Sequence, residues 1–363
     1  MKIIHCSDLH LDSKMEANLD KEKARERKNE ILITFENMVE YAKNNNVSAI
    51  IIAGDLFDKK NVSVKAKKIV KNAIVSNPKI DFIYLKGNHD ESGFIDEEET
   101  IPANLLMFNS NGWTTYEYGN ITITGIEFGG KGEYEIYNSL NLEKNKFNIV
   151  VMHGQEAQTD VKDKAEIINL KELKNKNIDY LALGHIHKFK QEKLDNRGIY
   201  CYSGCLEGRG FDECGEKGFV LLDIEENKFE TTFVPFSKRN LYEVEVDITG
   251  LAENSEIEEK IKEQLKDIPN TSLIKIVLTG EVELESSRDI EYLVKKFEEY
   301  FYFVKIYDRP RIKIDYMKYQ YDASLKGEFI RLVLKQDLTD EEKNQIIATG
   351  IKALSGEEVW KWS

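Results

Sequence analysis

Five short stretches in the first half of the chain place histidine, aspartate or both directly after an apolar run. An apolar run of this length is typical of a buried strand. Imidazole and carboxylate groups are costly in a core, but at a strand end a metal or a phosphate can satisfy them. The chain has six histidines, and five of them lie in these stretches. The stretches are Cys6-Ser7-Asp8-Leu9-His10, Ala53-Gly54-Asp55-Leu56-Phe57-Asp58, Lys86-Gly87-Asn88-His89-Asp90, Val151-Met152-His153-Gly154 and Leu183-Gly184-His185-Ile186-His187.

The spacing within two of these stretches suits metal binding. Asp8 and His10 are two residues apart, so at an extended strand end their side chains point the same way, and His185 and His187 repeat this arrangement. Oxygen and imidazole ligands together favour Mn, Fe or Zn over Mg or Ca. With one bridging carboxylate, seven residues give two metal ions four contacts each, and two adjacent metal ions hold a hydroxide and polarise phosphoryl oxygens. The candidate ligands are Asp8, His10, Asp55, Asn88, His153, His185 and His187.

The stretch around His89 adds a candidate proton donor. Asn88 is a neutral oxygen ligand, which limits the negative charge that faces an anionic substrate. His89 is expected to point into the cleft, where it stabilises the transition state or protonates the leaving oxygen. Each piece alone has a simpler interpretation: an isolated Asp-x-His is usually a hydrogen-bonded pair, and an isolated His153 is a satisfied core histidine. All five stretches in order, each after a strand, favour a metal centre.

Periodicity predicts the elements that must position these side chains. Strands at 2–6, 47–53 and 81–85 alternate with amphipathic helices at 21–44 and 62–75, and this order predicts a largely parallel sheet with helices on its face. Further along, strands dominate and predict a second sheet packed on the first. These strands are 121–126, 147–152, 178–183, 199–203, 219–224 and 229–236, and one helix interrupts them near 164–174.

The sequence pattern resets near residues 237–240 and then alternates strands and helices as far as residue 308. The chain after this point has no histidine and no cysteine, so we expect a compact α+β domain without metal chemistry. Two more helices follow, and Thr339 with Glu342 forms a capping box for the last one. The predicted domains are 1–237 for the metal site, 238–335 for the α+β domain, and 336–363 for a C-terminal helical segment that could dock a partner.

The composition limits the class of protein. Of 363 residues, 41% are hydrophobic and 32% are charged, which is typical of a folded soluble protein. The net charge of −14 argues against a general polyanion-binding surface, but bound divalent cations and local basic patches could still attract nucleic acid. No apolar run is long enough to span a membrane, and the N-terminus lacks the apolar core of a signal peptide. The four cysteines form no C-x-x-C pair and suit free thiols in a reducing cytoplasm.

The motifs D-x-H, G-D-x-x-D, G-N-H-D, H-G and G-H-x-H, in that order, resemble those of the calcineurin-like metallophosphoesterase superfamily. Within the superfamily, residues 9–13 and the loop 202–211 resemble the SbcD-type DNA repair exonucleases. The resemblance implies a four-layer α/β/β/α sandwich with a smaller α+β cap domain. It also implies Mn-dependent cleavage of DNA, often from 3′ to 5′, in complex with an SbcC-type ATPase. A homodimer is left open.

By its motifs, the resemblance implies two metal sites that share Asp55. Metal one would take Asp8, His10, Asp55 and His187, and metal two would take Asp55, Asn88, His153 and His185. His89 would be the acid or transition-state residue, with Asp90 as its orienting partner. Some nucleases of this group carry a second active-site histidine where this chain has Asp58, and a carboxylate donates a proton near neutral pH only if its pKa is raised. The implied metal is Mn²⁺, with Fe²⁺ and Zn²⁺ as alternatives.

Two regions outside the metal motifs could contact nucleic acid. Arg209, in the glycine-rich loop 203–218, could clamp a phosphate, although the loop is equally well a plain connection between strands. In 301–321, basic residues alternate with tyrosines that could stack bases, although an amphipathic strand pair with a solvated face has the same pattern. The basic candidates there are Lys305, Arg309, Arg311 and Lys313. Trp360 and Trp362 could dock a partner or pack against their own domain.

Three functions from different classes fit the sequence. The first is a two-metal DNA exonuclease or endonuclease that acts in DNA repair. The second is a phosphodiesterase or phosphatase for a small nucleotide or metabolite, which the acidic net charge favours. The third is a non-catalytic scaffold, which the complete set of candidate ligands disfavours.

Overall fold

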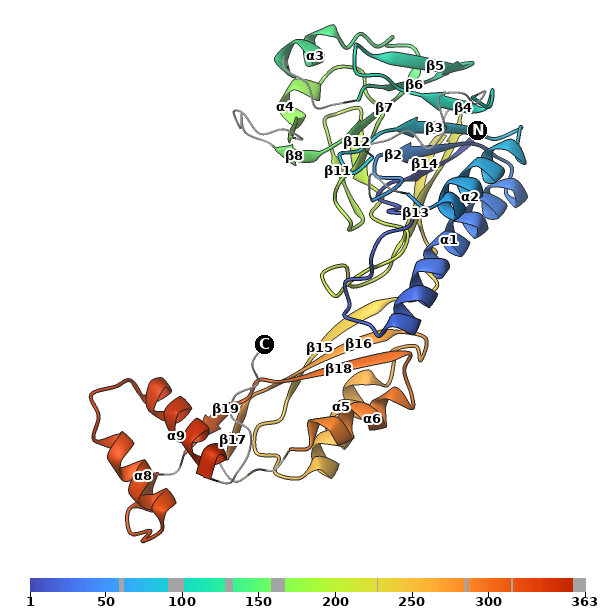
Figure 1. Cartoon of the computed structure of the whole chain (residues 1–363). Coiled ribbons are helices and arrows are strands. Elements are labelled where there is room, and N and C mark those ends of the chain that lie inside the picture. Colours follow the sequence, from blue (N-terminus) through green and yellow to red (C-terminus); the bar gives the residue numbers. More distant parts are fainter. Residues whose placement is uncertain are drawn as a thin grey trace. The chain divides into compact units, whose positions relative to one another are not determined.

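The computed structural model of the chain describes residues 1–58, 62–90, 101–127, 133–157, 167–226, 228–283, 286, 288–314 and 316–354. It contains two compact units, Met1–Asn240 and Leu241–Ser363. Figure 1 shows the helices and strands of both units. The predicted domain boundaries after residues 237 and 335 stay predictions.

The first sheet of the first unit is built around its N-terminal strand. β1 (Lys2–Cys6), β2 (Val47–Ala53), β3 (Asp81–Leu85) and β4 (Leu105–Met107) run parallel to one another. On the other side of β1 lie the antiparallel strands β13 (Gly218–Glu225) and β14 (Lys228–Pro235). The order across the sheet is therefore β14-β13-β1-β2-β3-β4.

The second sheet of the first unit has the order β11-β12-β10-β7-β6-β5. Its central strands β12 (Ile199–Tyr202), β10 (Tyr180–Gly184), β7 (Phe147–His153) and β6 (Ile121–Gly125) are parallel. The edge strands β11 (Lys190–Lys193) and β5 (Thr114–Tyr118) are antiparallel to their neighbours. β8 (Gln155–Ala157) and β9 (Ile167–Asn169) form a separate short parallel pair.

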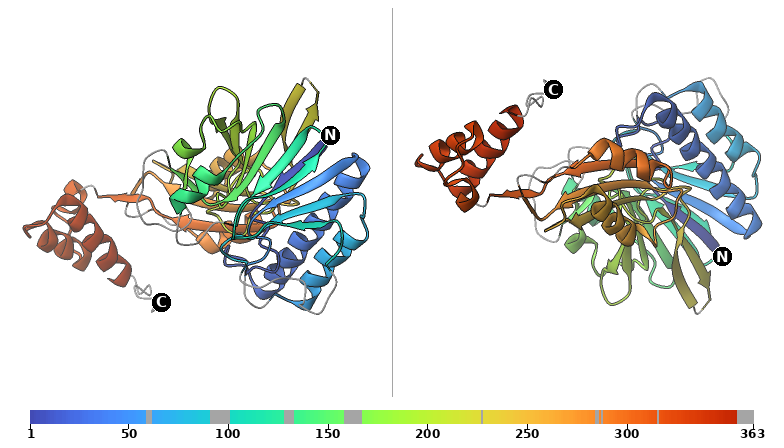
Figure 2. Two further views of the ribbon diagram at one scale, coloured as in Figure 1. Left: turned by 90° about the horizontal axis from the view of Figure 1, so that it is seen from above. Right: turned by 90° about the horizontal axis from the view of Figure 1, so that it is seen from below.

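Helices cover the outer faces of both sheets, so the first unit has four layers (Figure 1). α1 (Lys21–Asn44) and α2 (Val64–Val75) lie side by side on the first sheet (Figure 2), and α3 (Glu133–Ser139) and α4 (Leu170–Leu173) pack on the second. β2 is apolar on both faces because Ile50 and Ile52 contact the helices, while Ala49, Ile51 and Ala53 contact the second sheet. The predicted α/β/β/α sandwich is confirmed.

Two local predictions about the first unit are wrong. β13 and β14 belong to the first sheet, where Ile3 of β1 lies opposite Leu222 of β13, and not to the second. Alternating apolar residues identify a strand but not its partner, because pairing depends on contacts between distant parts of the chain. The helix expected near 164–174 is the four-residue α4, which follows directly after β9, and residues 158–166 lie outside the described part.

The second unit contains a three-stranded parallel sheet in the order β15-β16-β18. β15 (Leu241–Asp247), α5 (Asn254–Leu265), β16 (Leu273–Thr279), α6 (Ile290–Glu298) and β18 (Phe303–Asp308) alternate along the chain, and both helices pack on one face of the sheet. β17 (Glu281–Glu283) pairs with β19 (Arg311–Lys313), and α7 (Tyr316–Tyr319), α8 (Leu325–Leu334) and α9 (Asp340–Leu354) follow. Thr339 and Glu342 exchange side chain-to-backbone hydrogen bonds, which confirms the predicted capping box. Among the helices of the described ranges, none has the length and apolar content needed to cross a membrane.

A buried ion-pair network connects α1 to the loop after β12 and to the last residues of the first unit. Arg27 is 1% exposed, and its guanidinium donates to Glu30 at 2.6 Å and to Glu207 at 2.9 Å. Arg239 Nε donates to Glu30 at 3.0 Å. Burial alone would raise the pKa of Glu30, but hydrogen bonds from Arg239, Lys238 and Arg27 outweigh it and lower the pKa to about 2. The network therefore depends on Glu30 being ionised.

We expect Glu30→Gln to destabilise the protein in a pH-dependent way. The folded pKa of about 2 lies below the ordinary value of 4.5, so ionised Glu30 contributes stability above pH 4.5 that is lost as the pH falls toward 2. Breaking a buried ion pair costs about 3 kcal/mol near neutral pH. The difference in free energy of unfolding between wild type and variant, measured by urea unfolding, should shrink as the pH falls through this window. Glu36→Gln, which is exposed on the same helix, should show no such difference. A constant difference at all pH values would contradict the role of Glu30.

Candidate metal centre

The predicted ligands follow strand ends that meet at one edge of the first unit. β1, β2 and β3 are parallel neighbours in the first sheet, and β7 and β10 are parallel neighbours in the second. The sheets approach each other here, since Nδ1 of His153 on β7 lies 2.9 Å from the carbonyl oxygen of Ala53 on β2. Parallel sheets bind ligands at the carboxyl ends of their strands. The structure brings all seven predicted ligands to this edge.

Several of these residues have a left-handed backbone. The φ angle is 51° at Asp8, 43° at His10, 52° at Asp55 and 103° at His185. Residues other than glycine rarely adopt positive φ, which costs about 1–2 kcal/mol each. Hydrogen bonds between the first two strand ends hold the turns, from Asp8 N–H to the Gly54 carbonyl at 3.1 Å and from His10 N–H to the Asp55 carbonyl at 3.0 Å. Backbone strain at several of the candidate ligands indicates that the placement of their side chains serves a function.

Two glycines in the motifs let ligands from other strands approach the backbone. A Cβ atom on Gly87 would lie 2.1 Å from Oδ1 of Asp55, and one on Gly54 would lie 2.0 Å from Nδ1 of His153. No side chain fits at either position. The backbone N–H of His89 also donates to Oδ1 of Asp55 at 2.9 Å, which fixes the carboxylate between the strand ends.

Two histidines make a hydrogen bond through Nδ1, and a third, His10, has a carboxylate oxygen near this atom. Nδ1 of His153 donates to a backbone carbonyl oxygen at 2.9 Å, and a carbonyl can only accept. Nδ1 of His187 lies 2.6 Å from Oε1 of Glu213, and Nδ1 of His10 lies 3.2 Å from Oδ1 of Asp58. A neutral imidazole with its proton on Nδ1 offers the lone pair of Nε2 to a metal. All three rings therefore present a ligand atom.

The donor atoms around His10 and His187 fit a divalent cation. Their Nε2 atoms are 3.2 Å apart, and with both protons on Nδ1 two lone pairs face each other. Oδ2 of Asp55 lies 3.8 Å from Nε2 of His10, and Oδ1 of Asp8 lies 3.8 Å from Nε2 of His187. A cation between these atoms removes the repulsion, and mixed carboxylate and imidazole donors are a common transition-metal set. This group matches the ligands expected for metal one.

A second group of donors lies on the other side of Asp55. Nε2 of His153 is 3.4 Å from Oδ2 of Asp55 and 3.0 Å from Oδ1 of Asn88. The ring of His185 stands perpendicular to that of His153, with centroids 5.4 Å apart, and the backbone N–H of His185 donates to Asp8 at 2.9 Å. Asp55 thus contacts both groups, which is the position of a bridging ligand.

The buried aspartates make the electrostatic potential of the centre negative. Burial alone would raise the pKa of Asp55, but the hydrogen bond and charge of His153 and the charge of His10 lower it to about 2. Burial alone would lower the pKa of His153, but the hydrogen bond to Asp55 and the charge of Asp8 raise it to about 9. Carboxylates that hold a proton on histidine also favour a divalent cation, which competes with that proton.

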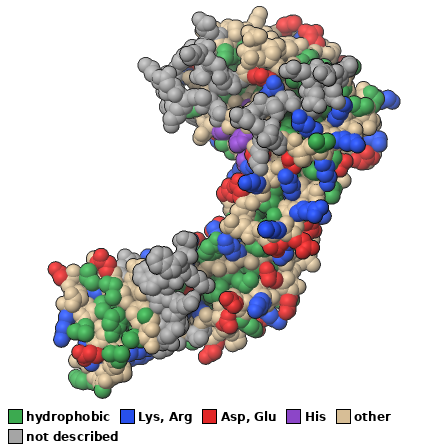
Figure 3. All heavy atoms as spheres, viewed as in Figure 1, with side chains coloured by type: hydrophobic (Ala, Val, Ile, Leu, Met, Phe, Trp, Pro, Cys, Tyr) green, Lys and Arg blue, Asp and Glu red, His purple; other side chains and the backbone are tan. Residues whose placement is uncertain are grey.

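His89 lies at the open side of the centre, with 46% of its side chain exposed. Figure 3 shows histidine side chains that reach the surface of the first unit. Nδ1 of His89 lies 3.2 Å from Oδ1 of Asp58, so Asp58 occupies the orienting position that the resemblance assigns to Asp90. Asp90 instead accepts hydrogen bonds from the backbone N–H groups of Phe57 at 2.8 Å and Gly87 at 3.0 Å. It thereby holds two of the motif turns together.

The loop between β12 and β13 brings two more charged residues to the centre. The predicted phosphate-binding residue Arg209 is 9% exposed, with Nη1 3.6 Å from Asp58 and Nη2 3.3 Å from Nδ1 of His187. Glu213 accepts from Arg209 at 2.8 Å and contacts His187, and sequence reasoning did not find it. Its one signal was an acidic residue four positions after an arginine in a glycine-rich loop, which is too common a pattern to decide anything.

Two of the predicted basic DNA contacts lie on β18 of the second unit and its C-terminal end. Nζ of Lys305 is 5.0 Å and Cζ of Arg309 is 5.3 Å from the centre of the Tyr307 ring. Nζ of Lys275, on the neighbouring strand, is 5.4 Å from the same centre. A ring that already contacts cations is not an open platform for base stacking, so the positive charges are the more useful feature for binding nucleic acid.

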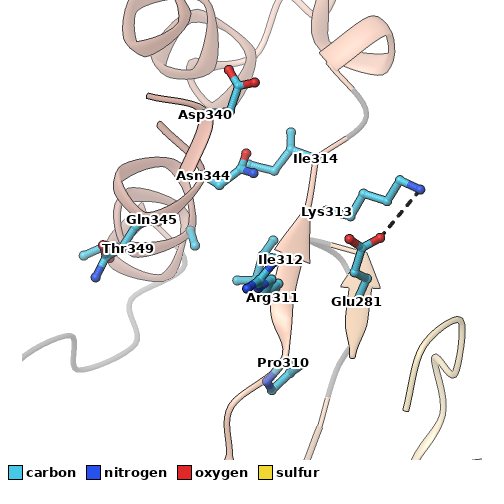
Figure 4. A pocket seen from close by; sticks show the side chains of 11 residues that line it. Glu281, Pro310, Arg311, Ile312, Lys313, Ile314, Asp340, Asn344, Gln345 and Thr349 are labelled. Atoms are coloured by element: carbon cyan, nitrogen blue, oxygen red, sulfur yellow. Dashed lines mark ion pairs between the residues drawn. The ribbon is translucent and has the colours of Figure 1, made fainter. Parts of the chain in front are cut away.

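Arg311 and Lys313 line a groove between β19 and α9 (Figure 4). The α9 side of the groove includes Asn344 and Thr349. Lys313 lies 3.9 Å from Glu281, an exposed pair that contributes little to stability. Cations beside amide and hydroxyl groups suit a phosphate backbone. Trp360 and Trp362 lie outside the described residues.

Comparison of the sequence with known proteins identifies its family. The sequence profile of the calcineurin-like phosphoesterases matches residues 1–189. The chain belongs to this family. Calcineurin-like phosphoesterases bind divalent metal ions, and the groups described above are candidate ligands for them. The protein is therefore a metal-dependent phosphoesterase. Bound metal ions supply the Lewis acid and the activated water of such a reaction.

Three named proteins are similar in sequence to this calcineurin-like phosphoesterase. The uncharacterized metallophosphoesterase YhaO of Bacillus subtilis is 26% identical over 235 residues, which cover 62% of this chain and 57% of that protein. The DNA double-strand break repair protein Mre11 of Sulfurisphaera tokodaii is 28% identical over 268 residues, which cover 69% and 67% of the two chains. Mre11 of Thermoplasma acidophilum is 25% identical over 336 residues, which cover 86% and 84%.

We expect Asp55→Asn to bind divalent metal ions much more weakly than the wild type, because Asp55 contacts both ligand groups and the amide carries no charge. A ligand that binds only the folded state raises Tm, so Mn²⁺ should raise the Tm of the wild type and leave that of the variant almost unchanged. Calorimetric titration gives the affinities. Asp212→Asn, an exposed aspartate in the loop 203–218, is the matched control. Equal Mn²⁺ affinity in Asp55→Asn and wild type would rule out the bridging position.

Proposed function

We propose that this protein is a DNA nuclease that hydrolyses phosphodiester bonds with two divalent metal ions, Mn²⁺ first and Fe²⁺ or Zn²⁺ as alternatives. The observation that carries the proposal is the position of Asp55 between His10 and His153, with the exposed ring of His89 beside this centre. Such a pair of sites suits in-line displacement at phosphorus. The relatives named Mre11 support DNA as the substrate, because their names describe the repair of DNA breaks.

His89 is the proposed proton donor. The contact of its Nδ1 with Asp58 directs Nε2 to the opposite side of the ring. The leaving oxygen of the phosphodiester takes the proton from Nε2 as the P–O bond breaks. In this proposal Asp58 orients the ring and donates no proton itself, so its place in a position held by histidine in some related nucleases does not remove the acid.

Basic residues of both units are the proposed contacts to the DNA backbone. Arg209 lies in the first unit beside Asp58 and His187, and Lys305 and Arg309 lie in the second. Arg311 and Lys313 belong to the same proposal. With a net charge of −14, these contacts must act locally, and DNA binding should weaken steeply with salt. Cys6, Cys201 and Cys205 are buried thiols that form no disulfide, which supports a reducing compartment such as the cytoplasm as the place of action.

We expect His89→Gln to lower kcat for DNA cleavage about 100- to 10,000-fold while Mn²⁺ content stays at the wild-type level. His153→Gln should lose metal as well as activity, because this proposal makes His153 a ligand and His89 a proton donor. The measurement is the shortening of labelled single- and double-stranded linear DNA, with Mn²⁺ content determined in parallel. Equal loss of metal in the two variants would refute the role of His89.

The same assay separates the two enzymatic functions. A nitrophenyl diester, a nitrophenyl monoester, cyclic nucleotides and DNA are compared as substrates of the metal-loaded wild type. Fast turnover of cyclic nucleotides with intact DNA would favour a small-nucleotide phosphodiesterase, which the acidic net charge also suits. No turnover of any phosphoester would refute both.

We further propose that an SbcC-like ATPase docks on α8 and α9 of the second unit. Leu325 is 70% exposed, Leu332 51% and Ile346 41%. Figure 3 shows hydrophobic side chains gathered on this part of the surface. Apolar patches of this kind often mark protein interaction sites. The resemblance to SbcD-type nucleases supports an ATPase as the occupant.

We expect Leu332→Glu to weaken binding of the ATPase about 10-fold or more, because a charge replaces an apolar contact at the interface. Surface plasmon resonance with the ATPase from the same organism measures the affinity. Val64→Glu, an equally drastic change at an exposed apolar residue of α2, is the control and should bind like the wild type. Hydrolysis of a nitrophenyl diester should be the same in all three proteins. Unchanged affinity of Leu332→Glu would place the interface elsewhere.

A further inference from the structure

The loop 203–218 contacts two candidate ligands of metal one, His187 directly and Asp8 through Ser7. Nζ of Lys217 donates to the backbone carbonyl of His187 at 2.8 Å. The hydroxyls of Ser203 and Ser7 are 2.9 Å apart, and the Ser7 hydroxyl donates to the carboxylate of Asp8 at 2.5 Å. The loop lies beyond residue 189, where the match to the family profile ends. Ligands from the first part of the chain therefore depend on a segment outside it.

Glu213 is the residue of this loop with the most direct contact to a ligand side chain. It is 4% exposed, and its Oε1 accepts from Nδ1 of His187 at 2.6 Å and from Nη2 of Arg209 at 2.8 Å. Its Oε2 accepts from the backbone N–H of Arg209 at 2.7 Å. Both oxygens are thus committed, and the carboxylate has one orientation that satisfies all its donors.

We propose that Glu213 is a positioning residue for metal one, an inference that rests on the proposed two-metal phosphodiesterase. Its carboxylate sets the rotation of the His187 ring, so that Nε2 faces His10 at 3.2 Å and Asp8 at 3.8 Å. The negative charge on Glu213 also makes Nε2 of His187 a stronger donor to a cation. At the same time Glu213 holds the guanidinium of Arg209 beside Asp58, at 3.6 Å.

The proposal separates the two metal sites. His187 belongs to the group of Asp8 and His10, whereas His153 has its own acceptor in a backbone carbonyl. Loss of the Glu213 carboxylate should therefore weaken metal one and leave metal two as it is. In Glu213→Gln the charge is gone and one of the two oxygens becomes an amide NH₂, which can no longer accept from Arg209 or His187.

The test compares Glu213→Gln with Glu216→Gln. Glu216 lies in the same loop and is exposed, so the two variants share the chemical change and differ only in contact with the centre. Free Mn²⁺ is followed by electron paramagnetic resonance as the metal is titrated into metal-free wild type and each variant. Wild type and Glu216→Gln should bind two ions alike. In Glu213→Gln one of the two sites should bind about 10- to 100-fold more weakly.

Turnover of a nitrophenyl diester gives an independent readout. At low Mn²⁺ the kcat of Glu213→Gln should fall, and excess Mn²⁺ should restore most of it, which a purely structural defect would not allow. The variant Arg209→Gln removes side-chain hydrogen bonds to Glu213 but leaves the carboxylate charged and beside His187, so it should weaken this site less than Glu213→Gln does. If Arg209→Gln weakens this site as much as Glu213→Gln does, the arginine and not the carboxylate carries the effect, and the proposal is wrong.

Two other outcomes overturn the inference. Identical Mn²⁺ binding in Glu213→Gln and Glu216→Gln would show that the carboxylate does not position a ligand. Equal weakening of both sites, together with a lower free energy of unfolding, would show a structural role for the whole loop. A wild type that binds no Mn²⁺ and cleaves no diester is a separate result, because it refutes the proposed function before any variant is compared.

Discussion

The carboxylate of Asp55 is the interaction on which the centre depends. It is 2% exposed, accepts a hydrogen bond from the strand end of β3 through His89 N–H at 2.9 Å, and lies 3.4 Å from His153 on β7. Asp55 follows β2 directly, and β2 is held in place because its side chains are buried on both faces of the sheet. A slip of one residue in the register of β2 would exchange these faces, so the packing of the core also sets the position of the metal ligands.

The parts of the structure that the sequence predicted well depend on local patterns. α1 spans Lys21–Asn44 as its apolar stripe indicates, and Asp20 caps it through two backbone N–H groups. The seven candidate ligands were recognisable because they lie at the ends of five apolar strands. The strand order could not be recognised in the same way, since β1 pairs with β13, which lies near the other end of the first unit in the sequence. The role of Glu213 was not predicted for the same reason, because its partner His187 lies 26 residues away and nothing in the local sequence connects the two.

Four histidines of the centre have different neighbours at Nδ1. A backbone carbonyl holds His153, Glu213 holds His187, and Asp58 lies beside both His10 and His89. The carbonyl adds no net charge, whereas each carboxylate adds one. Charge is therefore concentrated behind the histidines of metal one and behind His89. The two sides of the centre should differ in how strongly they attract cations, even though their ligands are of similar chemical type.

The position of β1 in the middle of its sheet has a consequence for synthesis of the protein. Asp8 and His10 follow directly after β1, which is synthesised long before its partner strand β13. One neighbour of β1 is β13, which is formed by residues 218–225. The sheet is therefore incomplete until Leu222 has been synthesised and can pair with Ile3. Pairings over such sequence distances form late. The nascent chain therefore carries no finished hydrolytic centre until almost the whole first unit has been translated.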